Sequence, residues 1–362
     1  MNKEIISDKQ GIALMVMLII GTSSIVVTGL EAKKDLLIAI ILSILMTLPL
    51  MIIYARLHHM FKDKDLFDIL EICFGRFIGK FISILYVLYL LYVGASILWV
   101  QGEFAITVSL SKTPRIIVAI IIIINGIFII KKGMEVMGRW TEFFVIILIT
   151  FILSTVVLMI PNMNINNIRP ILGEGIKPVI KGATSAFAFP FSQTVVFTMA
   201  FSNFKSEKSS YKIYVRGLFL GGIIILITSL NDVLVLGINT CTTMYFPTYV
   251  AASKINIGDI LQRIEVIIGI IFMLGAFIKL SIYLLAFCKG ISKVFGYTDY
   301  RFIVIPASLL MMNLSDFVYE SLMYYSEWVE STWVYISFPF HVAFPVFTLI
   351  VAEIRKKGLV NN

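Results

Sequence analysis

Long apolar runs separated by short polar segments dominate the sequence. Hydrophobic residues make up 59% of the chain and charged residues only 14%, far more apolar sequence than a water-soluble core requires. About 20 helical residues cross a bilayer. Ten runs approach or exceed this length, near residues 10–30, 36–56, 81–108, 115–131, 140–160, 183–203, 214–238, 264–288, 302–318 and 333–353. The pattern predicts an all-α integral membrane protein with about ten transmembrane helices.

The placement of basic residues predicts the orientation of these helices. With the N-terminus inside, the inner segments carry 20 of the 30 Lys and Arg residues and the outer loops carry nine. Cytoplasmic loops are enriched in Lys and Arg, so both termini are expected to be cytoplasmic. The same placement accounts for the net charge of +8 without invoking nucleic acid.

The longest turn-forming stretch, residues 161–182, divides the predicted spans into five and five. Because five is odd, the second half must enter the membrane from the opposite side, as in an inverted-topology repeat. The predicted organisation is a first five-helix repeat (1–160), an extracytoplasmic connecting loop (161–182), an inverted second repeat (183–353) and a cytoplasmic tail (354–362). Ten unrelated helices with a central loop are the alternative.

The sixth predicted span is interrupted by Pro190, beside Ser192 and Gln193. Proline removes one backbone hydrogen bond and clashes with the preceding turn. Lipid cannot repair that loss, so such a break persists only inside protein or against a water-filled cavity. Transporters hold small solutes at breaks of this kind. A simple proline kink without a ligand is the plainer interpretation.

The first predicted span contains a comparable interruption, Gly21-Thr22-Ser23-Ser24, about eleven residues into the helix. Its hydroxyls can bond back to the preceding turn or coordinate a solute, and small residues also serve close helix packing. The first and sixth spans correspond in an inverted repeat. Breaks at corresponding positions in the two halves indicate a central binding site.

Lys279 lies deep in the eighth predicted span. A lysine at mid-membrane costs about 2.5–3.5 kcal/mol on insertion scales, so it should face the protein interior and have a partner. Three roles fit: a fixed ammonium standing in for a coupling cation, a partner for the carboxylate of an amino-acid ligand, or half of a structural ion pair with Asp232 or Glu103.

Tyr92 and Ser96 belong to a stripe of polar and aromatic residues along the third span and lie too centrally for an interfacial belt. They line a cavity or serve packing alone. Asp232 and Glu103 are the remaining intramembrane acids, suited to proton relay or to solvation near the outer mouth.

An enzyme is not supported by the sequence. There is no phosphate-binding glycine loop, no metal-spaced set of His or Cys, and no nucleophile with a base at a recognisable spacing. The three cysteines are widely separated and indicate no disulfide or redox motif. No cofactor and no metal are expected.

The chain resembles the spore germination permease family, the B subunits of A/B/C-type germinant receptors within the amino acid–polyamine–organocation superfamily. The resemblance rests on Ile6-Ser7-Asp8-Lys9-Gln10 before the first span, on the ten-span plan, and on Phe189-Pro190-Phe191 followed by Val196-Phe197. It implies a LeuT-type fold with broken first and sixth helices. It also implies a small germinant, typically an amino acid, bound between them, and complex formation with A and C subunits in the spore inner membrane.

The resemblance also implies that residues at the breaks of the first and sixth spans bind the ligand. Together with the three positions on the third and eighth spans, the candidate ligand-binding residues are Gly21, Thr22, Ser23, Ser24, Tyr92, Ser96, Phe187, Phe189, Pro190, Ser192, Gln193 and Lys279. The family pattern commonly has Gly-Glu after Pro-Phe, whereas this chain has Ser192-Gln193. An uncharged amide cannot hold a cation or proton as a carboxylate does, which weakens the case for ion coupling at this position and suggests a changed ligand preference.

The sequence therefore predicts a germinant-sensing membrane subunit of a spore germination receptor. Two alternatives stay open. One is an active amino-acid permease coupled to protons or ions, and the other is a structural subunit or part of an ion-release conduit.

Overall fold

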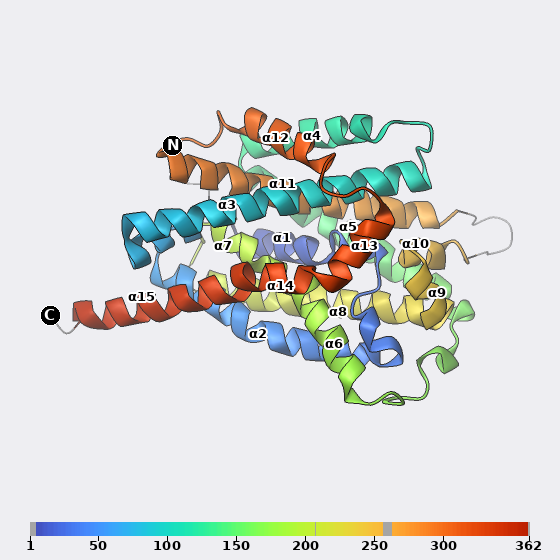
Figure 1. Ribbon diagram of the computed structural model, residues 1–362. Helices are drawn as coiled ribbons and strands as arrows, with labels where there is room; N and C mark the ends of the chain where they lie inside the picture. Colours follow the sequence, from blue (N-terminus) through green and yellow to red (C-terminus); the bar gives the residue numbers. More distant parts are fainter. Residues whose placement is uncertain (1–4, 207, 256–262, 361–362) are drawn as a thin grey trace.

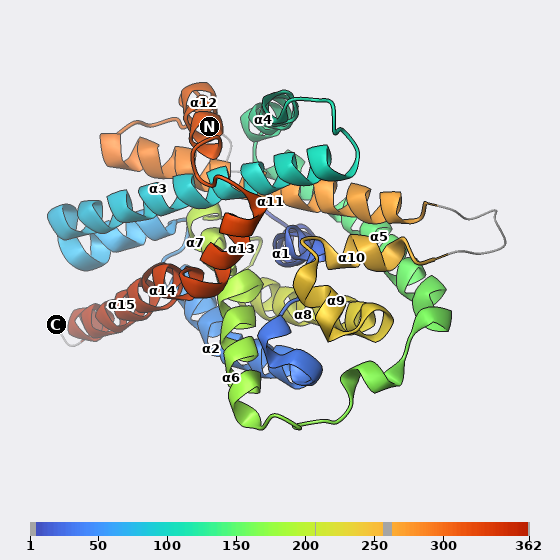
Figure 2. The ribbon, with the colours of Figure 1, turned by 45° about the vertical axis from the view of Figure 1, so that its right-hand side comes forward.

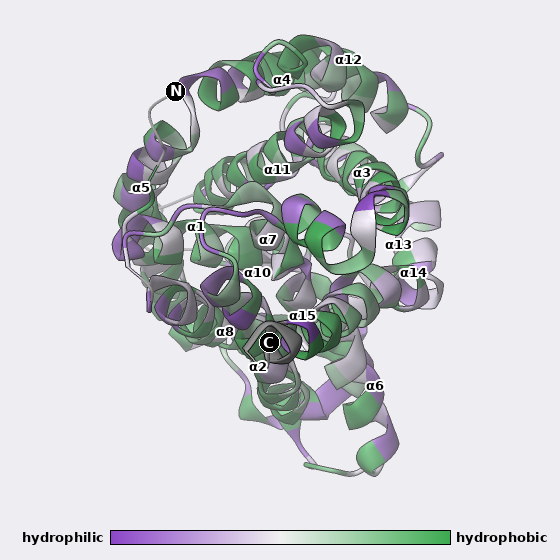
Figure 3. Ribbon diagram, turned by 90° about the vertical axis from the view of Figure 1, so that its left-hand side faces the viewer, coloured by the Kyte–Doolittle hydropathy of each residue, from purple (hydrophilic) through white to green (hydrophobic). Residues whose placement is uncertain are grey.

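The computed structural model describes residues 5–206, 208–255 and 263–360. Within these ranges the regular structure is helical, apart from one isolated bridge between Ile6 and Phe204. Most of the long helices run side by side along one direction, and the chain ends lie at the same end of this bundle (Figures 1 and 3).

The first half of the chain forms α1 Asp8–Ile20, α2 Leu36–Met60, α3 Leu66–Val108, α4 Arg115–Lys132 and α5 Met134–Met159. The second half forms α6 Ile176–Ala186, α7 Val196–Ala200, α8 Ser209–Leu236, α9 Ile238–Thr243, α10 Pro247–Ala252, α11 Glu265–Phe295, α12 Val304–Ser315, α13 Leu322–Ser331, α14 Trp333–Phe338 and α15 Phe344–Val360. Short 3₁₀ or π turns follow α1, α5, α6 and α14.

Six of the described helical segments are long and apolar enough to cross a membrane: Leu30–Met60, Leu66–Val108, Met134–Asn162, Ser209–Leu236, Glu265–Phe295 and Trp333–Arg355. Of the other four predicted spans, α12 is a shorter apolar helix and α4 carries three basic residues at its ends. The remaining two are the first and sixth, and both are interrupted.

The interrupted first span lies inside the bundle. Residues 13–20 of α1 are all buried, and the helix packs against α5, α8 and α11 (Figure 2). Large apolar side chains elsewhere are strongly exposed, including Phe77 at 89%, Phe143 at 64% and Phe347 at 60%. Exposed apolar surface on long helices is what lipid contact requires. The chain is an integral membrane protein, and hydrophobic residues are spread over its helices in Figure 3.

Candidate ligand site between the broken first and sixth helices

The first span begins with a strong helix start and ends early. Ser7 Oγ accepts from the Gln10 amide at 3.2 Å, and Gln10 Oε1 accepts from the Ser7 amide at 3.1 Å, which forms a reciprocal capping box. The α-helix ends at Ile20, a 3₁₀ turn follows over Ser23–Ile25, and Val26 is extended. The predicted interruption at residues 21–24 is therefore present.

Gly21 lets the first span approach α11 closely. A Cβ atom on Gly21 would lie 2.8 Å from the backbone oxygen of Gly275, and a Cβ on Gly275 would lie 2.9 Å from the Gly21 Cα. Only glycine at both positions permits this backbone contact. Close packing is thus the role that the structure gives to Gly21, and it holds the break against the helix that carries Lys279.

The sixth span is interrupted at Pro190. The helix α6 ends at Ala186, a π turn spans Phe187–Phe191, and Phe189 has extended backbone angles (φ −146°, ψ 118°). Proline disfavours helical angles in the residue before it, which explains the extended Phe189. The Ala188 carbonyl accepts instead from Trp333 Nε1 at 3.1 Å.

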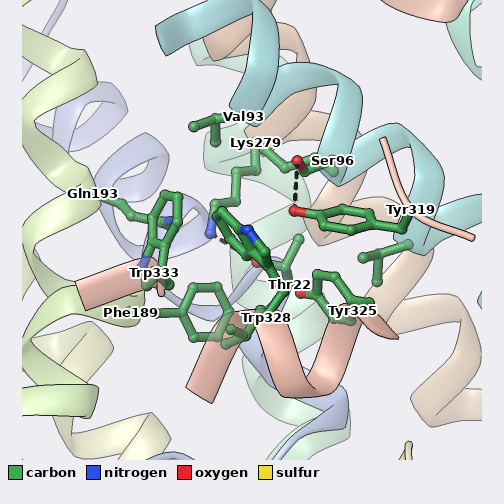
Figure 4. A pocket seen from close by; sticks show the side chains of 13 residues that line it. Thr22, Val93, Ser96, Phe189, Gln193, Lys279, Tyr319, Tyr325, Trp328 and Trp333 are labelled. Carbon is green, nitrogen blue, oxygen red and sulfur yellow. Dashed lines mark hydrogen bonds between the residues drawn. The ribbon is translucent and has the colours of Figure 1, made fainter. Parts of the chain in front are cut away.

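A cavity lies between the two breaks, α3, α11 and the segment from Tyr319 to Trp333, and Figure 4 shows it from close by. The space not filled by protein atoms, including the mouth, is about 440 Å³. It is lined by Thr22, Val93, Ser96, Ile97, Val100, Phe189, Gln193, Lys279, Tyr319, Tyr325, Trp328, Val329 and Trp333.

Lys279 is the one charged side chain among these lining residues, and its exposed fraction is 0%. Its Nζ donates to Thr22 Oγ1 at 2.7 Å and lies 4.9 Å from the centre of the Phe189 ring. The proposed acid partners are engaged elsewhere: Glu103 binds Arg115 at 2.8 Å, and Asp232 accepts from a threonine hydroxyl. Within the described residues, Lys279 has no ion pair with a carboxylate.

Aromatic side chains from the C-terminal part of the chain close one side of the cavity. Trp328 packs at 5.8 Å from the Tyr319 ring and 5.9 Å from the Trp333 ring. Tyr319 is anchored to α3, because its hydroxyl lies 3.1 Å from Ser96 Oγ and 2.7 Å from Tyr92 Oη. This aromatic wall places apolar surface beside the Lys279 ammonium.

Gln193 adds an unused acceptor. Its side chain is 4% exposed, and its Oε1 has no hydrogen-bond partner among the described residues. A buried polar atom without a partner is costly, so a donor group on a bound molecule would be stabilised here. The site thus combines a buried ammonium, an amide oxygen and aromatic walls.

A model of the spore germination protein family matches residues 5–319. The chain belongs to this family. The resemblance to this family that was drawn from the sequence is therefore confirmed.

Two relatives from Bacillus subtilis (strain 168) show how far the similarity extends. Spore germination protein KB is 27% identical over 99% of this chain and 97% of its own length. Spore germination protein YndE is 25% identical over 92% of this chain and 91% of its own length. The similarity therefore covers the whole helical bundle, including both breaks.

A solved transporter shares the fold. Mhp1, a nucleobase-cation-symport-1 family transporter, superimposes with a TM-score of 0.72 at 11% identity, over 95% of this chain and 77% of Mhp1. At that identity the likeness concerns the fold alone. This spore germination protein thus has the transporter-like helical fold that the sequence predicts.

Five of the twelve predicted site residues line the cavity of this germination protein: Thr22, Ser96, Phe189, Gln193 and Lys279. Tyr92 does not line the cavity, but its hydroxyl contacts that of the lining residue Tyr319. Phe187 and Pro190 belong to the π turn but do not line the cavity. The hydroxyls of Ser23 and Ser24 donate back to Ile19 and Gly21 oxygens, the local bonding that the sequence left open.

Ser192 takes part in a buried network that the sequence did not predict. Its Oγ lies 2.6 Å from His341 Nδ1, and His341 Nε2 lies 2.5 Å from Tyr89 Oη. His341 belongs to a π turn after α14. In the sequence this histidine is isolated, and only the packing of the last span against the sixth span and α3 gives it partners. The network ties the break to α3 and to the last span.

Proposed function

We propose that this chain is the nutrient-sensing membrane subunit of a spore germination receptor and that it binds an amino acid in the cavity beside Lys279. Membership of the spore germination family supports the role in germination. The cavity between two interrupted helices supports binding of a small solute, since transporters hold substrates at such positions.

The main support for this proposal is the environment of the Lys279 ammonium. Its ammonium is fully buried at the cavity, with a hydroxyl and an aromatic ring as its described contacts. A buried charge is stabilised by an opposite charge with good hydrogen bonds. The carboxylate of an amino acid would supply that charge, and the α-ammonium group of the same amino acid would donate to Gln193 Oε1. The side chain would then lie against the aromatic wall.

We further propose the full topology predicted from the sequence: ten spans in an inverted five-plus-five arrangement, with both termini cytoplasmic. Both chain ends lie at one end of the bundle (Figure 1), as an even number of crossings requires. Single cysteines at Lys64 and Ser111, both exposed, test this orientation after replacement of the three buried native cysteines. A membrane-impermeant maleimide should label Ser111→Cys on intact cells and Lys64→Cys only after permeabilisation; the reverse pattern overturns the topology.

As a receptor subunit, the protein would act with A and C subunits in the spore inner membrane. Binding would stabilise one arrangement of the broken helices, and the partners would respond to that population. The likeness to Mhp1 supports a second candidate, a permease that moves its solute across the membrane.

Two measurements on purified protein test these candidates. The first is thermal unfolding with a panel of L-amino acids and their carboxamides. An amino acid that binds should raise the unfolding temperature, and the carboxamide of the same amino acid should not. No stabilisation by any amino acid contradicts nutrient binding in this chain alone. Sustained accumulation of the stabilising amino acid in vesicles containing only this chain would establish the permease instead of a sensor.

A further inference from the structure

A second cavity lies beside the first break and shares no lining residue with the Lys279 cavity. It is enclosed by the first span, α5, α8, α10 and α11. Its residues are Ile20, Ser24, Ile152, Thr155, Val156, Met159, Ile224, Ile225, Thr228, Asn231, Asp232, Thr248, Ile268 and Ile271. One side chain in this set, Asp232, is ionisable.

The Asp232 carboxylate is 0% exposed and has neutral partners. Oδ2 accepts from Thr248 Oγ1 at 2.6 Å, and Oδ1 accepts from Asn231 Nδ2 at 3.4 Å. No Lys or Arg is paired with it among the described residues, and the neighbouring Cys241 thiol contacts its backbone oxygen. Neutral donors orient a buried carboxylate but do not balance its charge.

Other side-chain oxygens that line this cavity also keep unused acceptor capacity. Asn231 is 3% exposed, and its Oδ1 has no hydrogen-bond partner in the described part of the chain. The hydroxyls of Thr155 and Thr228 donate to backbone oxygens of their own helices, and Ser24 donates to Gly21 O. A hydroxyl that donates its proton keeps acceptor lone pairs, so these oxygens are available as ligands.

The geometry points to a binding site for a small, dehydrated monovalent cation of the sodium type in this cavity, with Asp232 as its charged ligand. Hard cations prefer carboxylate, carbonyl and hydroxyl oxygens. A single carboxylate balances one positive charge, whereas the described lining residues offer no second acid for a divalent ion. The site connects the first break, through Ser24, to α5 and α8.

Thermal unfolding of the purified full chain in NaCl against choline chloride, at fixed ionic strength and pH and without nutrient, tests this site. Sodium should raise the unfolding temperature saturably, and calorimetric titration with NaCl should give a matching affinity. Asp232→Asn should abolish both responses. Glu174→Gln, which removes an exposed carboxylate paired with Lys33, should leave them unchanged.

Thr155→Val provides a second variant should Asp232→Asn fail to fold. It retains the carboxylate and the approximate volume, and it should raise the sodium concentration at half-saturation severalfold. Equal unfolding temperatures in sodium and choline would overturn the proposal, as would an unchanged sodium response in Asp232→Asn or Thr155→Val. A stability that follows pH with no sodium effect would show that a proton neutralises Asp232, and it would overturn the cation site.

Discussion

Replacement of Lys279 by Met separates a ligand-binding ammonium from a structural one. Without nutrient, burying the lysine costs about 2.5–3.5 kcal/mol. A charge-assisted hydrogen bond of the kind made to Thr22 contributes about 1.5–3 kcal/mol, and a desolvated contact with an aromatic face such as Phe189 about 2 kcal/mol. These effects nearly offset one another, and Met keeps the apolar stem. The free energy of unfolding should change by only about 1 kcal/mol.

With nutrient, the same substitution should have a large effect. Removing one partner of a buried, hydrogen-bonded charge pair costs about 2–5 kcal/mol. At about 1.4 kcal/mol per tenfold, the affinity should fall roughly 30-fold to 4,000-fold. Thermal unfolding of Lys279→Met, with and without the stabilising amino acid, measures both quantities. Lys181→Met, which removes an exposed lysine on α6, is the matched control.

A contrary result would be clear. If Lys279→Met unfolds several kcal/mol more easily without nutrient and still binds the amino acid with the affinity of the original chain, the ammonium is structural. Lys279 would then not be the partner of a ligand carboxylate.

Three further results are expected. Gly21→Ala places a Cβ 2.8 Å from Gly275 O and should destabilise the protein by about 1–3 kcal/mol in thermal unfolding. Gly126→Ala, whose Cβ meets only Leu284 at 3.7 Å, should not destabilise it. Equal effects of the two substitutions would contradict the close approach of the first span to α11. Ser192→Ala leaves a buried His341 nitrogen without its partner. The free energy of unfolding should fall by about 1–3 kcal/mol, while nutrient affinity changes less than tenfold. A larger loss of affinity than of stability would place Ser192 in the ligand site. Burial and the nearby Asp68 carboxylate raise the pKa of Asp65 to about 6, so the folded state binds its proton more tightly than the unfolded state, and this contribution to stability is present near pH 4 and lost as pH rises to about 6. Asp65 caps α3 by accepting from the Asp68 amide at 3.0 Å, and asparagine can do the same. Asp65→Asn should therefore remove that dependence in unfolding measured across this range, and an unchanged slope would exclude Asp65 as its source.

The interruptions of the first and sixth spans could be predicted because their signals are local. Pro190 removes a backbone donor wherever it stands, and the Gly21–Ser24 run interrupts an aliphatic stretch of the first span. The depth of Lys279 follows equally from its position in an apolar run. These features depend on a few neighbouring residues and on the bilayer, so tertiary contacts do not alter them.

The remaining walls of the site could not be predicted, because they form only by packing. Tyr325 and Trp328 lie on α13, a short helix with no completely buried residue and little hydropathy signal. Their approach to the breaks depends on how the last spans cross the bundle. The directions of the Ser23 and Ser24 hydroxyls were equally undetermined, because a serine in a broken helix can bond to its own turn or to a solute.

Equilibrium binding of the radiolabelled amino acid to purified Phe189→Ala is the sharpest test of a nutrient site between the broken helices. Phe189 lies at the break, lines the cavity and faces the Lys279 ammonium. Phe347→Ala, which removes a 60% exposed ring on α15, is the control. Saturable binding should be lost in Phe189→Ala and retained in Phe347→Ala. Saturable binding of unchanged affinity in Phe189→Ala would contradict a nutrient site between the broken helices.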